Sequence, residues 1–432
     1  MKFPGKRKSK HYFPVEEVGR LPFETNFDSK ENIYIVGIDQ LLVDIEIDTS
    51  FEFLEKFDLE KGQSVVLSDE IIEKIYIECK DNGSIIGEFA GGAVGNTLHN
   101  YSTLSDDKSV ALGTICESIK VGDYAFKYIC NTSSKVDFGH LQPHKGHMGR
   151  AMCFVTPDKE RTFAIGKGIM NELREEFIPE DVVKNASALL VTAFLLRDKS
   201  APLYKSTLRA VKIAKENNVP VVFALGTSAL ISSDVSFFKD FIKENVNIVA
   251  MNIDEAEALT NLSDPLLAAE TILEIADFAL VTVGERGLYI GAWADTEDAR
   301  ETSDLIHSKS ISEYNKFEYS RAQIKENCKR PIKVFSHINP FMGGPIKIEN
   351  TNGAGDAALA ALMHDIAAND YHKGVSPSSP KHNSNYLTYS SIHQICKYAN
   401  RTSYEVLKQR SPRLSHGLPI KEESLEESYW TK

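Results

Sequence analysis

The stretch NTNGAGDAALAALMHDI, residues Asn350 to Ile366, decides how the whole chain is interpreted. Three small residues precede the acidic Asp356, and a run of good helix formers follows. A helix that begins near Gly355 leaves its first N–H groups unpaired, at the positive end of its dipole. Because small side chains let an anion come close, Gly353, Ala354 and Gly355 are predicted to form a cradle for a phosphate.

Asp356 has two interpretations in this setting. It can cap the helix behind a Gly-containing turn, and this is the favoured interpretation of a GAG-D pattern that stands alone. A carboxylate beside a phosphate cradle makes electrostatic sense, however, if it removes a proton from a hydroxyl that then attacks phosphorus. The chain contains no GxxxxGK[ST] loop, so a phosphotransferase with this sequence needs a different nucleotide site.

The composition describes an ordinary globular protein and excludes some partners. The chain has 432 residues, 42% of them hydrophobic, which suits one large elaborated domain or two domains. The 49 basic and 61 acidic residues give a net charge of -12, so we expect no nucleic-acid partner. No apolar segment approaches the about 20 residues of a membrane span, and no apolar run follows the basic N-terminal arm. The sequence therefore predicts a cytoplasmic protein without a membrane contact.

Apolar runs alternate with amphipathic segments over much of the chain. Strands of continuous apolar character that are separated by helices are typical of a parallel sheet covered on both faces. The strand-like runs are 33–39, 187–196, 219–226, 246–251 and 278–283, and the helix-like segments are 202–217, 235–244 and 254–276. The fold class is predicted to be α/β, with a doubly wound and mainly parallel sheet.

Three regions break this alternation. Residues about 45–88 and 121–165 hold short strand-like pieces without obvious crossover helices, which suits a small sheet at the edge of the main one. Residues about 291–348 are long, polar and irregular, and they are interpreted as an insertion.

Several motifs together resemble those of the ribokinase-like, or phosphofructokinase-B type, sugar and nucleoside kinases. NTNGAGD at 350–356 resembles the family's DTxGAGD signature, and AGGAVGNTLHNYSTL at 90–104 resembles its GG-x-x-x-N element. Further similar elements are GIDQLLVD (37–44), PDKERTF (157–163), NIDEAEALT (252–260) and VTVGERG (281–287). Six weak elements in the family's order make the resemblance specific.

The resemblance implies a fold and an activity. Residues 31–432 would form one ribokinase-like kinase domain after a basic arm at 1–30, and the segments 45–88 and 121–165 would form its β-sheet lid. The implied activity is ATP-dependent phosphorylation of a nucleoside 5′-hydroxyl. The family motifs do not distinguish the acceptor base, and guanosine and inosine, in purine salvage, are implied by the resemblance of the whole chain to one member of the family. Two alternatives stay open: the same chemistry on adenosine or a free sugar, and a non-catalytic regulator that binds nucleosides.

The resemblance also assigns roles to residues. Asp356 would be the general base, and Gly353, Ala354 and Gly355 would form the anion hole. The sugar hydroxyls would be held by Asp44, Gly92 and Asn96, and Arg161 would be a lid residue near substrate or phosphate. On the ATP side the family's pattern matches Asn252, Glu255, Thr282 and Gly284, with Glu255 holding Mg²⁺ through water.

Alternative interpretations remain for several of these residues. Asp44 can be a solvated residue at a strand end, Asn96 a helix cap, and Arg161 a surface arginine. Asn252 and Glu255 can be an ordinary capped helix start.

One departure concerns the cation. The family signature opens with aspartate, which supplies a charged ligand where members bind a monovalent cation. Asn350 keeps a carbonyl oxygen without the charge, so K⁺ is a weaker expectation than ATP and Mg²⁺. The family includes monomers and dimers, which leaves a homodimer open.

Overall fold

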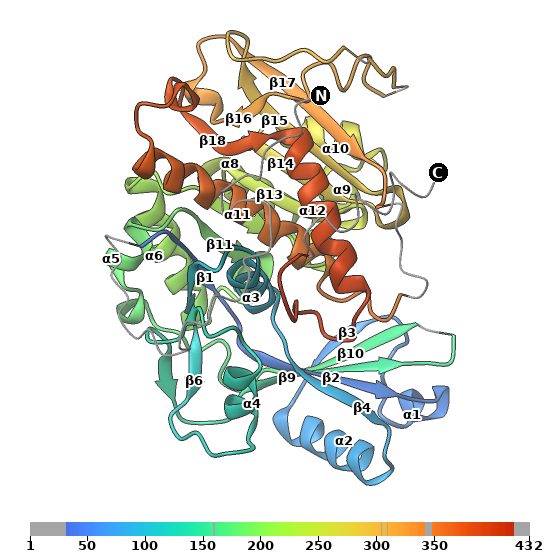
Figure 1. The fold of residues 1–432 in the computed structure, drawn as a ribbon. Coiled ribbons are helices and arrows are strands. Elements are labelled where there is room, and N and C mark those ends of the chain that lie inside the picture. The colour runs from blue at the N-terminus through green and yellow to red at the C-terminus, as the bar shows by residue number, and fades with distance from the viewer. Residues whose placement is uncertain (1–31, 159, 304, 309, 342–347, 419–432) are drawn as a thin grey trace, which may run out of the picture.

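The computed structural model describes residues 32–158, 160–303, 305–308, 310–341 and 348–418 (Figure 1). The basic arm predicted at 1–30 lies outside the described residues. Within the described part of the chain, no helix is long and apolar enough to cross a membrane.

A large mixed sheet forms the centre of the molecule. It has 11 strands in the order β18-β16-β15-β14-β13-β12-β11-β1-β5-β7, and β17 pairs with β15 beside this path. The strands are β1 (Tyr34–Ile38), β5 (Lys108–Leu112), β7 (Val136–Asp137), β11 (Leu189–Thr192), β12 (Val221–Ala224), β13 (Ile248–Asn252), β14 (Phe278–Thr282), β15 (Leu288–Asp295), β16 (Arg321–Gln323), β17 (Pro331–Ile338) and β18 (Tyr386–Ser391). The pairs from β7 through β14 are parallel, and the pairs of β15 are antiparallel.

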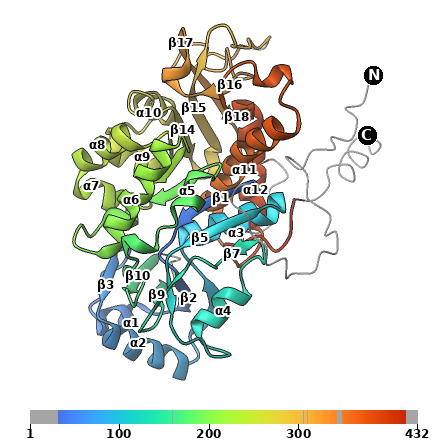
Figure 2. The same ribbon diagram turned by 90° about the vertical axis from the view of Figure 1, so that its left-hand side faces the viewer.

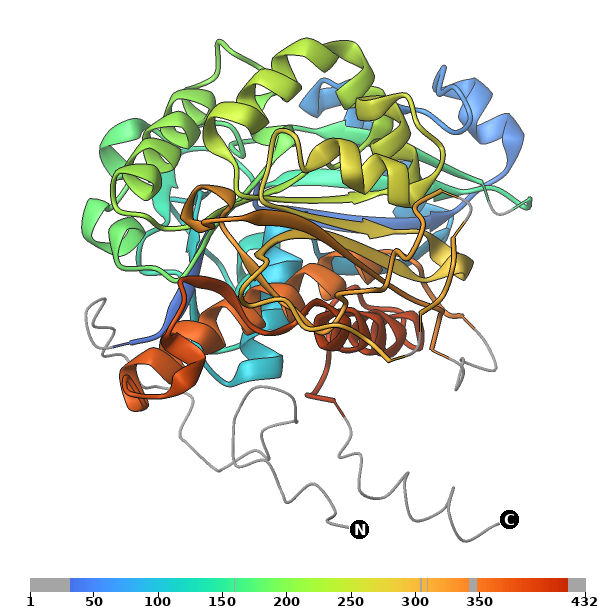
Figure 3. The same cartoon turned by 90° about the horizontal axis from the view of Figure 1, so that it is seen from above.

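The central strands are apolar because both faces of this sheet are covered. All five residues of β1 are buried, as are all four of β11. Helices α3, α11 and α12 pack on one face, and α5, α6, α8, α9 and α10 on the other (Figure 3). The helices are α3 (Ala93–Ser105), α5 (Glu180–Lys184), α6 (Pro202–Glu216), α7 (Ser228–Ser233), α8 (Val235–Asn245), α9 (Ile253–Thr260), α10 (Pro265–Ile272), α11 (Ala354–Val375) and α12 (Ile392–Leu407). The predicted α/β class, with a doubly wound and mainly parallel sheet, is confirmed.

A second sheet of five strands projects from the carboxyl ends of the main strands (Figures 1 and 2). Its order is β3-β10-β9-β2-β4, from β2 (Leu42–Asp48), β3 (Ser64–Leu67), β4 (Ile85–Ala90), β9 (Gly149–Val155) and β10 (Arg161–Gly166). One face packs on α1 (Phe51–Lys56) and α2 (Asp69–Asp81) through a separate apolar cluster. The sequence analysis found no helix here, although Ile72, Ile75 and Cys79 repeat at helical spacing and are buried.

The second expected lid segment, 121–165, divides between several parts of the fold. Strands β9 and β10 lie in the small sheet, whereas β7 pairs with β5 of the main sheet. Strand β8 (Gln142–His144), which follows β7, pairs with β6 (Thr114–Cys116), and α4 (Tyr124–Cys130), which precedes β7, packs beside β4.

The expectation of an irregular insertion at 291–348 is wrong at both ends of that range. Strand β15 runs to Asp295, and β16 and β17 both pair with it, so these residues extend the main sheet. The apolar pattern is weak here because two of the three buried residues of β16, Arg321 and Gln323, are polar, and because β17 is buried only in part.

Candidate active site

A cavity of about 310 Å³ lies between the two sheets, at the carboxyl ends of β1 and β11. Its lining comes from the small sheet, from the start of α3 and from the start of α11. The polar lining residues are Asp39, Gln40, Asp44, Glu46, Ser64, Asn96, Thr192, Arg197, Thr227, Asn350, Asn352 and Asp356. Open α/β sheets bind ligands at the carboxyl ends of their strands, so this is the candidate active site.

Helix α11 begins at this cavity, where the quoted stretch predicted it. Its N-cap is Gly353, whose φ of 79° lies in the left-handed region. A Cβ on Gly353 would also come within 2.5 Å of the carbonyl oxygen of Pro412. Glycine is therefore required here by both backbone conformation and packing.

The first N–H groups of α11 are available to a ligand. The helical ladder starts with Ala357 N–H donating to Gly353 O, at 2.8 Å. No acceptor for the N–H groups of Ala354 and Gly355 is found among the described residues. A Cβ on Gly355 would meet no atom within 4 Å, so protein packing does not require a glycine there. A glycine that faces open space at a helix start suits the close approach of a phosphate.

Asp356 points into the cavity from the first turn of α11. Its Oδ2 accepts a hydrogen bond from Nδ2 of Asn96 at 3.0 Å. Desolvation raises the pKa of Asp356 to about 7, the Asn96 hydrogen bond opposes that rise, and the charges of Asp44 and Asp39 add to it. A carboxyl group with a pKa near 7 is matched to removing a proton from a hydroxyl at neutral pH.

Two further carboxylates line the same cavity. Asp44 lies on β2, and burial raises its pKa to about 7 against the opposing charge of Arg413. Asp39 follows β1 directly and is 2% exposed, and burial raises its pKa to about 6. The neighbouring glycines leave room for them: a Cβ on Gly91 would come within 2.5 Å of the Asp44 carboxyl group, and one on Gly92 within 2.8 Å of Asp39.

Arg161 connects the small sheet to the loop before α11. It starts β10, and its Nη1 donates to Oδ1 of Asn352 at 2.5 Å, while Nη2 donates to Oδ1 of Asn350 at 3.1 Å. Nη1 also contacts the hydroxyl of Thr351 at 3.2 Å. The arginine is half-buried and directed at the active-site loop, which agrees with a lid residue better than with a surface arginine.

The residues matched to the ATP side lie at neighbouring strand ends and outside the cavity lining. Asn252 ends β13 and pairs in register with Thr282 at the end of β14, and Gly284 follows with φ 48°. Asn252 and Glu255 form a complete capping box for α9, in which both Glu255 oxygens accept from Asn252 at 2.9 Å. The pair therefore caps the start of α9, as one of its two interpretations expected.

Glu255 keeps an electrostatic connection to the site. Burial raises its pKa to about 7, and its charge contributes to the raised pKa of Asp356. No group of three or more His, Cys, Asp or Glu side chains that could hold a metal occurs among the described residues. A Mg²⁺ ion that enters with phosphate groups and its own waters needs few protein ligands, so Glu255 fits a water-mediated role.

The remaining walls of the cavity are mainly apolar. They are formed by Leu42, Phe89, Val94, Ala151, Cys153, Phe163, Ile165, Met170 and Phe194. Arg197 lies at the rim, with its guanidinium 5.1 Å from the centre of the Phe194 ring. No carboxylate partner for Arg197 is found in the described part of the chain. This apolar part of the cavity, which we call the apolar slot, has an unpaired planar donor at its rim, which suits a heterocyclic base.

Three residues that the structure brings to the site were not predicted from the sequence: Asp39, Arg197 and Arg413. Asp39 stands in the quoted GIDQLLVD element, and its place directly after a buried strand was a usable signal. Arg413 lies 4% exposed behind the cavity, in the segment after α12. A single arginine in an irregular segment carries no sequence signal.

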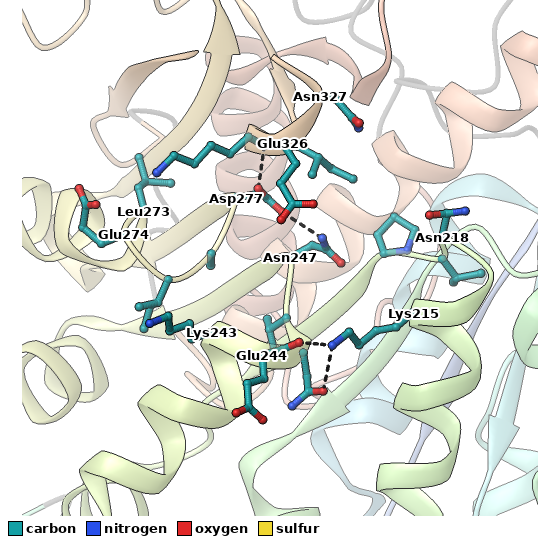
Figure 4. A pocket seen from close by; sticks show the side chains of 18 residues that line it. Lys215, Asn218, Lys243, Glu244, Asn247, Leu273, Glu274, Asp277, Glu326 and Asn327 are labelled. Atoms are coloured by element: carbon teal, nitrogen blue, oxygen red, sulfur yellow. Dashed lines mark hydrogen bonds between the residues drawn. The ribbon is translucent and has the colours of Figure 1, made fainter. Parts of the chain in front are cut away.

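A second cavity, of about 440 Å³, lies at the opposite, amino ends of β12, β13 and β14 (Figure 4). Two contacts link polar groups of its lining: Asn247 donates to Asp277 at 2.9 Å, and Lys215 contacts the backbone carbonyl of Glu244. The sequence-predicted site residues do not line it. The candidate active site is therefore the cavity at the carboxyl ends.

Comparison with known proteins identifies the family of the chain. The sequence profile of the pfkB family carbohydrate kinases matches residues 66–302. The chain is 51% identical over 436 residues to the guanosine-inosine kinase of Escherichia coli strain K12, with 100% of both chains covered. The chain belongs to the pfkB family of carbohydrate kinases. The resemblance inferred from the six motifs is thereby confirmed.

Solved structures support the fold of this pfkB-family kinase. A probable sugar kinase from Rhizobium etli CFN 42 superposes with a TM-score of 0.66 over 92% of this chain and 98% of that one, at 20% identity. The adenosine kinase of Sinorhizobium meliloti gives a TM-score of 0.64 at 20% identity, over 92% and 99% of the two chains. At these identities the likeness concerns the fold alone.

Proposed function

We propose that this pfkB-family kinase transfers the γ-phosphoryl group of ATP to the 5′-hydroxyl of guanosine and inosine, giving GMP and IMP. The observation that carries the proposal is the pairing, on one helix start, of the carboxyl group of Asp356 with the open N–H groups of Ala354 and Gly355. A simple binding protein has no need for a base beside an anion hole. The full-length identity to the Escherichia coli enzyme supports the choice of acceptor.

In this proposal Asp356 takes the proton of the 5′-hydroxyl as its oxygen attacks phosphorus. Its Oδ2 is held by Asn96, which leaves Oδ1 for the hydroxyl. The N–H groups at the start of α11, with Gly353 as the turn before them, stabilise the charge on the phosphate oxygens in the transition state. Mg²⁺ bound with ATP would neutralise phosphate charge, and Glu255 would hold it through water.

The ribose is assigned to the carboxylates on the opposite wall. Asp44 can accept from two adjacent hydroxyls at once, which suits a cis-diol, and Gly92 lets the ring come close to the backbone. Asn96 was expected to bind a sugar hydroxyl. Each of its polar side-chain atoms makes a contact within the protein, Nδ2 with Asp356 and Oδ1 with Arg413, so we assign it to positioning the general base Asp356.

The purine is assigned to the apolar slot with Arg197 at its rim. A guanidinium can donate two parallel hydrogen bonds to O6 and N7 of guanine or hypoxanthine, whereas the 6-amino group of adenine offers a donor at that position. This geometry favours the 6-oxo purines over adenosine.

The lid contact of Arg161 bears on the expected cation. Asn350 is 4% exposed, its Oδ1 accepts from Arg161, and its Nδ2 donates to Arg410 O at 2.7 Å. The oxygen that could bind K⁺ is thus already used by a positively charged side chain. We therefore propose that activity does not require K⁺.

The test is ADP release from MgATP with guanosine, inosine, adenosine and ribose as separate acceptors, each with and without K⁺. Turnover that favours guanosine and inosine supports the proposal. Activity mainly on adenosine or ribose would retain the mechanism and overturn the acceptor. No turnover with any acceptor would leave a nucleoside-binding regulator as the better function.

A further inference from the structure

Arg413 is a buried cation that reaches the active site from the end of the described chain. It lies 4% exposed beneath the start of α3, six residues after Leu407, the last residue of α12. No carboxylate lies within ion-pair distance of its guanidinium among the described residues. A buried charge needs compensation, so the partners of this guanidinium are informative.

Hydrogen bonds to neutral groups surround the guanidinium. Nε donates to Oδ1 of Asn96 at 3.0 Å, and Nη2 donates to the hydroxyl of Tyr128 at 3.1 Å. Nη1 donates to the hydroxyl of Thr132 at 2.5 Å, and Nη2 also reaches the carbonyl oxygen of Gly91 at 3.3 Å. The planar donor fork is fixed on three sides.

Two of these partners pass the interaction on to carboxylates of the cavity. Asn96 accepts from Arg413 through Oδ1 and donates through Nδ2 to Asp356 at 3.0 Å. Tyr128 accepts from Arg413 and donates its hydroxyl proton to Oδ2 of Asp39 at 3.1 Å. One guanidinium therefore sets the orientation of two relays, each of which ends on an active-site carboxylate.

The Asn96 relay has a definite direction because of Arg413. An arginine can only donate, so the side-chain oxygen of Asn96 must face it and the amide N–H₂ must face Asp356. Without the arginine the amide could rotate and place its oxygen against the carboxylate, which is repulsive. Tyr128 is directed in the same way, with its lone pairs toward Arg413 and its proton toward Asp39.

The surrounding chain is shaped to hold the arginine in this place. Leu414 N–H donates to Oδ1 of Asn100 at 2.8 Å, and Asn100 Nδ2 reaches Pro412 O at 3.4 Å, so the segment is bound to α3 on both sides of the arginine. A Cβ on Gly95 would come within 2.3 Å of the Tyr128 hydroxyl and 2.9 Å of the guanidinium. The absence of a side chain at Gly95 makes room for the cluster.

We propose that Arg413 is a positioning residue for phosphoryl transfer, which orients Asp356 through Asn96 and Asp39 through Tyr128 while supplying the positive charge behind the nucleoside site. The proposal rests on the proposed kinase function and deepens it. It predicts that the Asp356 relay governs the rate of transfer and that the Asp39 relay governs binding of the nucleoside.

Charge adds a second signature. The Arg413 charge lowers the pKa values of Asp39 and Asp44, which burial raises to about 6 and about 7. The titratable or charged groups around these two carboxylates are Arg413, Tyr128, Asp356, Cys153 and Glu46, and the charge of Asp39 also acts on Asp44. Removing the cation should raise both carboxyl pKa values further, so that nucleoside binding is lost at a higher pH as the solution is acidified.

The experiment compares four variants with the wild type in steady-state kinetics from pH 5.5 to 9: Arg413→Met, Arg413→Lys, Tyr128→Phe and Gln409→Ala. Gln409 donates to the backbone oxygen of Arg413 at 2.7 Å, so its alanine variant loosens the segment and leaves the guanidinium unchanged. It is the control for a merely structural role. Each variant is compared as a ratio to the wild type, with whichever acceptor the wild type turns over best.

We expect Arg413→Met to lower kcat by about 10- to 100-fold and to move the acid limb of kcat/KM for the nucleoside up by about one pH unit. Arg413→Lys keeps the charge and should keep the acid limb, although one ammonium cannot direct both relays and kcat stays low. Tyr128→Phe should raise the nucleoside KM with kcat nearly unchanged. Gln409→Ala should resemble the wild type.

The proposal is overturned if Arg413→Met has an unmoved acid limb, or if Gln409→Ala reproduces its kinetics. An equal loss of kcat in Tyr128→Phe would also overturn it, because the two relays would then not be separable. If the methionine variant does not fold, Arg413→Lys and Tyr128→Phe still test the proposal, because the first should lower kcat and the second should raise the nucleoside KM. Failure of the proposed function shows separately, as absent turnover of guanosine and inosine by the wild type.

Discussion

The side-chain amide of Asn96 donates a hydrogen bond to Oδ2 of Asp356 at 3.0 Å, across 260 residues of sequence. Asn96 lies in the first turn of α3 and Asp356 in the first turn of α11, and these two helices pack on the same face of the main sheet. The contact connects the motif at 90–104 with the motif at 350–356 in a single site. One oxygen of the carboxylate is fixed, and the other remains open to the cavity.

Replacing Asn96 with alanine should therefore impair the base without removing it. The Asn96 hydrogen bond lowers the pKa of Asp356, so its loss should raise that pKa above about 7 and move the acid limb of kcat to higher pH. We expect kcat at pH 7 to fall by about 10- to 100-fold. The measurement is the pH profile of kcat with saturating ATP and guanosine.

Thr103→Ala is the matched control for this variant. Thr103 lies on α3 as well, and its hydroxyl donates only to His99 O within the helix, at 2.8 Å. Its kinetics should equal those of the wild type. An unmoved acid limb in Asn96→Ala would mean that the contact does not act on the base.

Replacing Asp356 with asparagine should abolish transfer and leave binding intact. The loss of a general base commonly costs about two to four powers of ten in rate. Guanosine should still bind, because the asparagine is nearly the same size and the walls of the cavity are unchanged. An assay of ADP release checks the loss of transfer, and calorimetric titration with guanosine checks that binding is retained. Residual activity within tenfold of the wild type would remove Asp356 from the role of base.

The same variant makes a separate prediction about stability. The pKa of Asp356 rises from an ordinary 3.8 to about 7 in the folded protein, so between these values the folded state binds the extra proton. The stability that the protonated Asp356 carboxyl group contributes to the folded state is fully present below pH 4 and is lost as the pH rises through 7. Asp356→Asn has no such loss, and its free energy of unfolding should exceed that of the wild type by about 1 to 3 kcal/mol at pH 8.

Urea unfolding at pH 8 and pH 4.5 measures this difference. The advantage of the asparagine variant should shrink toward zero at the lower pH. Asp240→Asn, at an exposed position on α8, changes the net charge equally and should show no advantage at either pH. A variant that is equally destabilised at both values would contradict the raised pKa.

How far the sequence could predict this molecule depends on whether a signal is local. The buried parallel strands were predictable because both faces are covered, so their residues form continuous apolar runs such as β1. The start of α11 was predictable because glycines and a helix-forming run lie together. The long polar region before α11 was misjudged, since β16 and β17 are recognisable only from their pairing with β15.

The site shows the same limit. Asp356, Gly353 and Asp44 lie in motifs and were proposed as site residues. The second role of Asn96, as a link between Asp356 and Arg413, depends on a contact between residues 317 positions apart and has no local pattern. Asp39 could have been proposed from its position at the end of β1.

Arg161 gives a prediction about the lid. Its guanidinium joins β10 to the loop that precedes α11 by hydrogen bonds to Asn350 and Asn352. Arg161→Met removes the connection, so the lid should close less completely and admit water to the phosphate. We expect kcat for phosphoryl transfer to fall by about tenfold or more. The ratio of ATP hydrolysis, measured without nucleoside, to phosphoryl transfer should rise.

Lys61→Met is a suitable comparison for Arg161→Met. Lys61 belongs to the same lid and pairs with Asp158 at the surface, at 2.6 Å. An exposed pair contributes little to stability, so the ratio of hydrolysis to transfer should stay at the wild-type value. Equal ratios in both variants would show that Arg161 does not close the site.

Arg197 should decide between the purines. Its guanidinium lies at the rim of the apolar slot, beside the Phe194 ring and without a carboxylate partner in the described chain. A bidentate contact to the edge of a base discriminates by about 1 to 3 kcal/mol, so Arg197→Met should lower kcat/KM for guanosine and inosine by about 10- to 100-fold. The value of kcat/KM for adenosine should stay constant or rise, because an unfavourable donor has been removed.

Arg174→Met is the matched control. Arg174 also stacks on a phenylalanine, 5.1 Å from the centre of the Phe177 ring, but lies away from the cavity, so its variant should leave all three kcat/KM values unchanged. A parallel loss for all three nucleosides in Arg197→Met would mean that the arginine supports the wall of the slot and does not read the base.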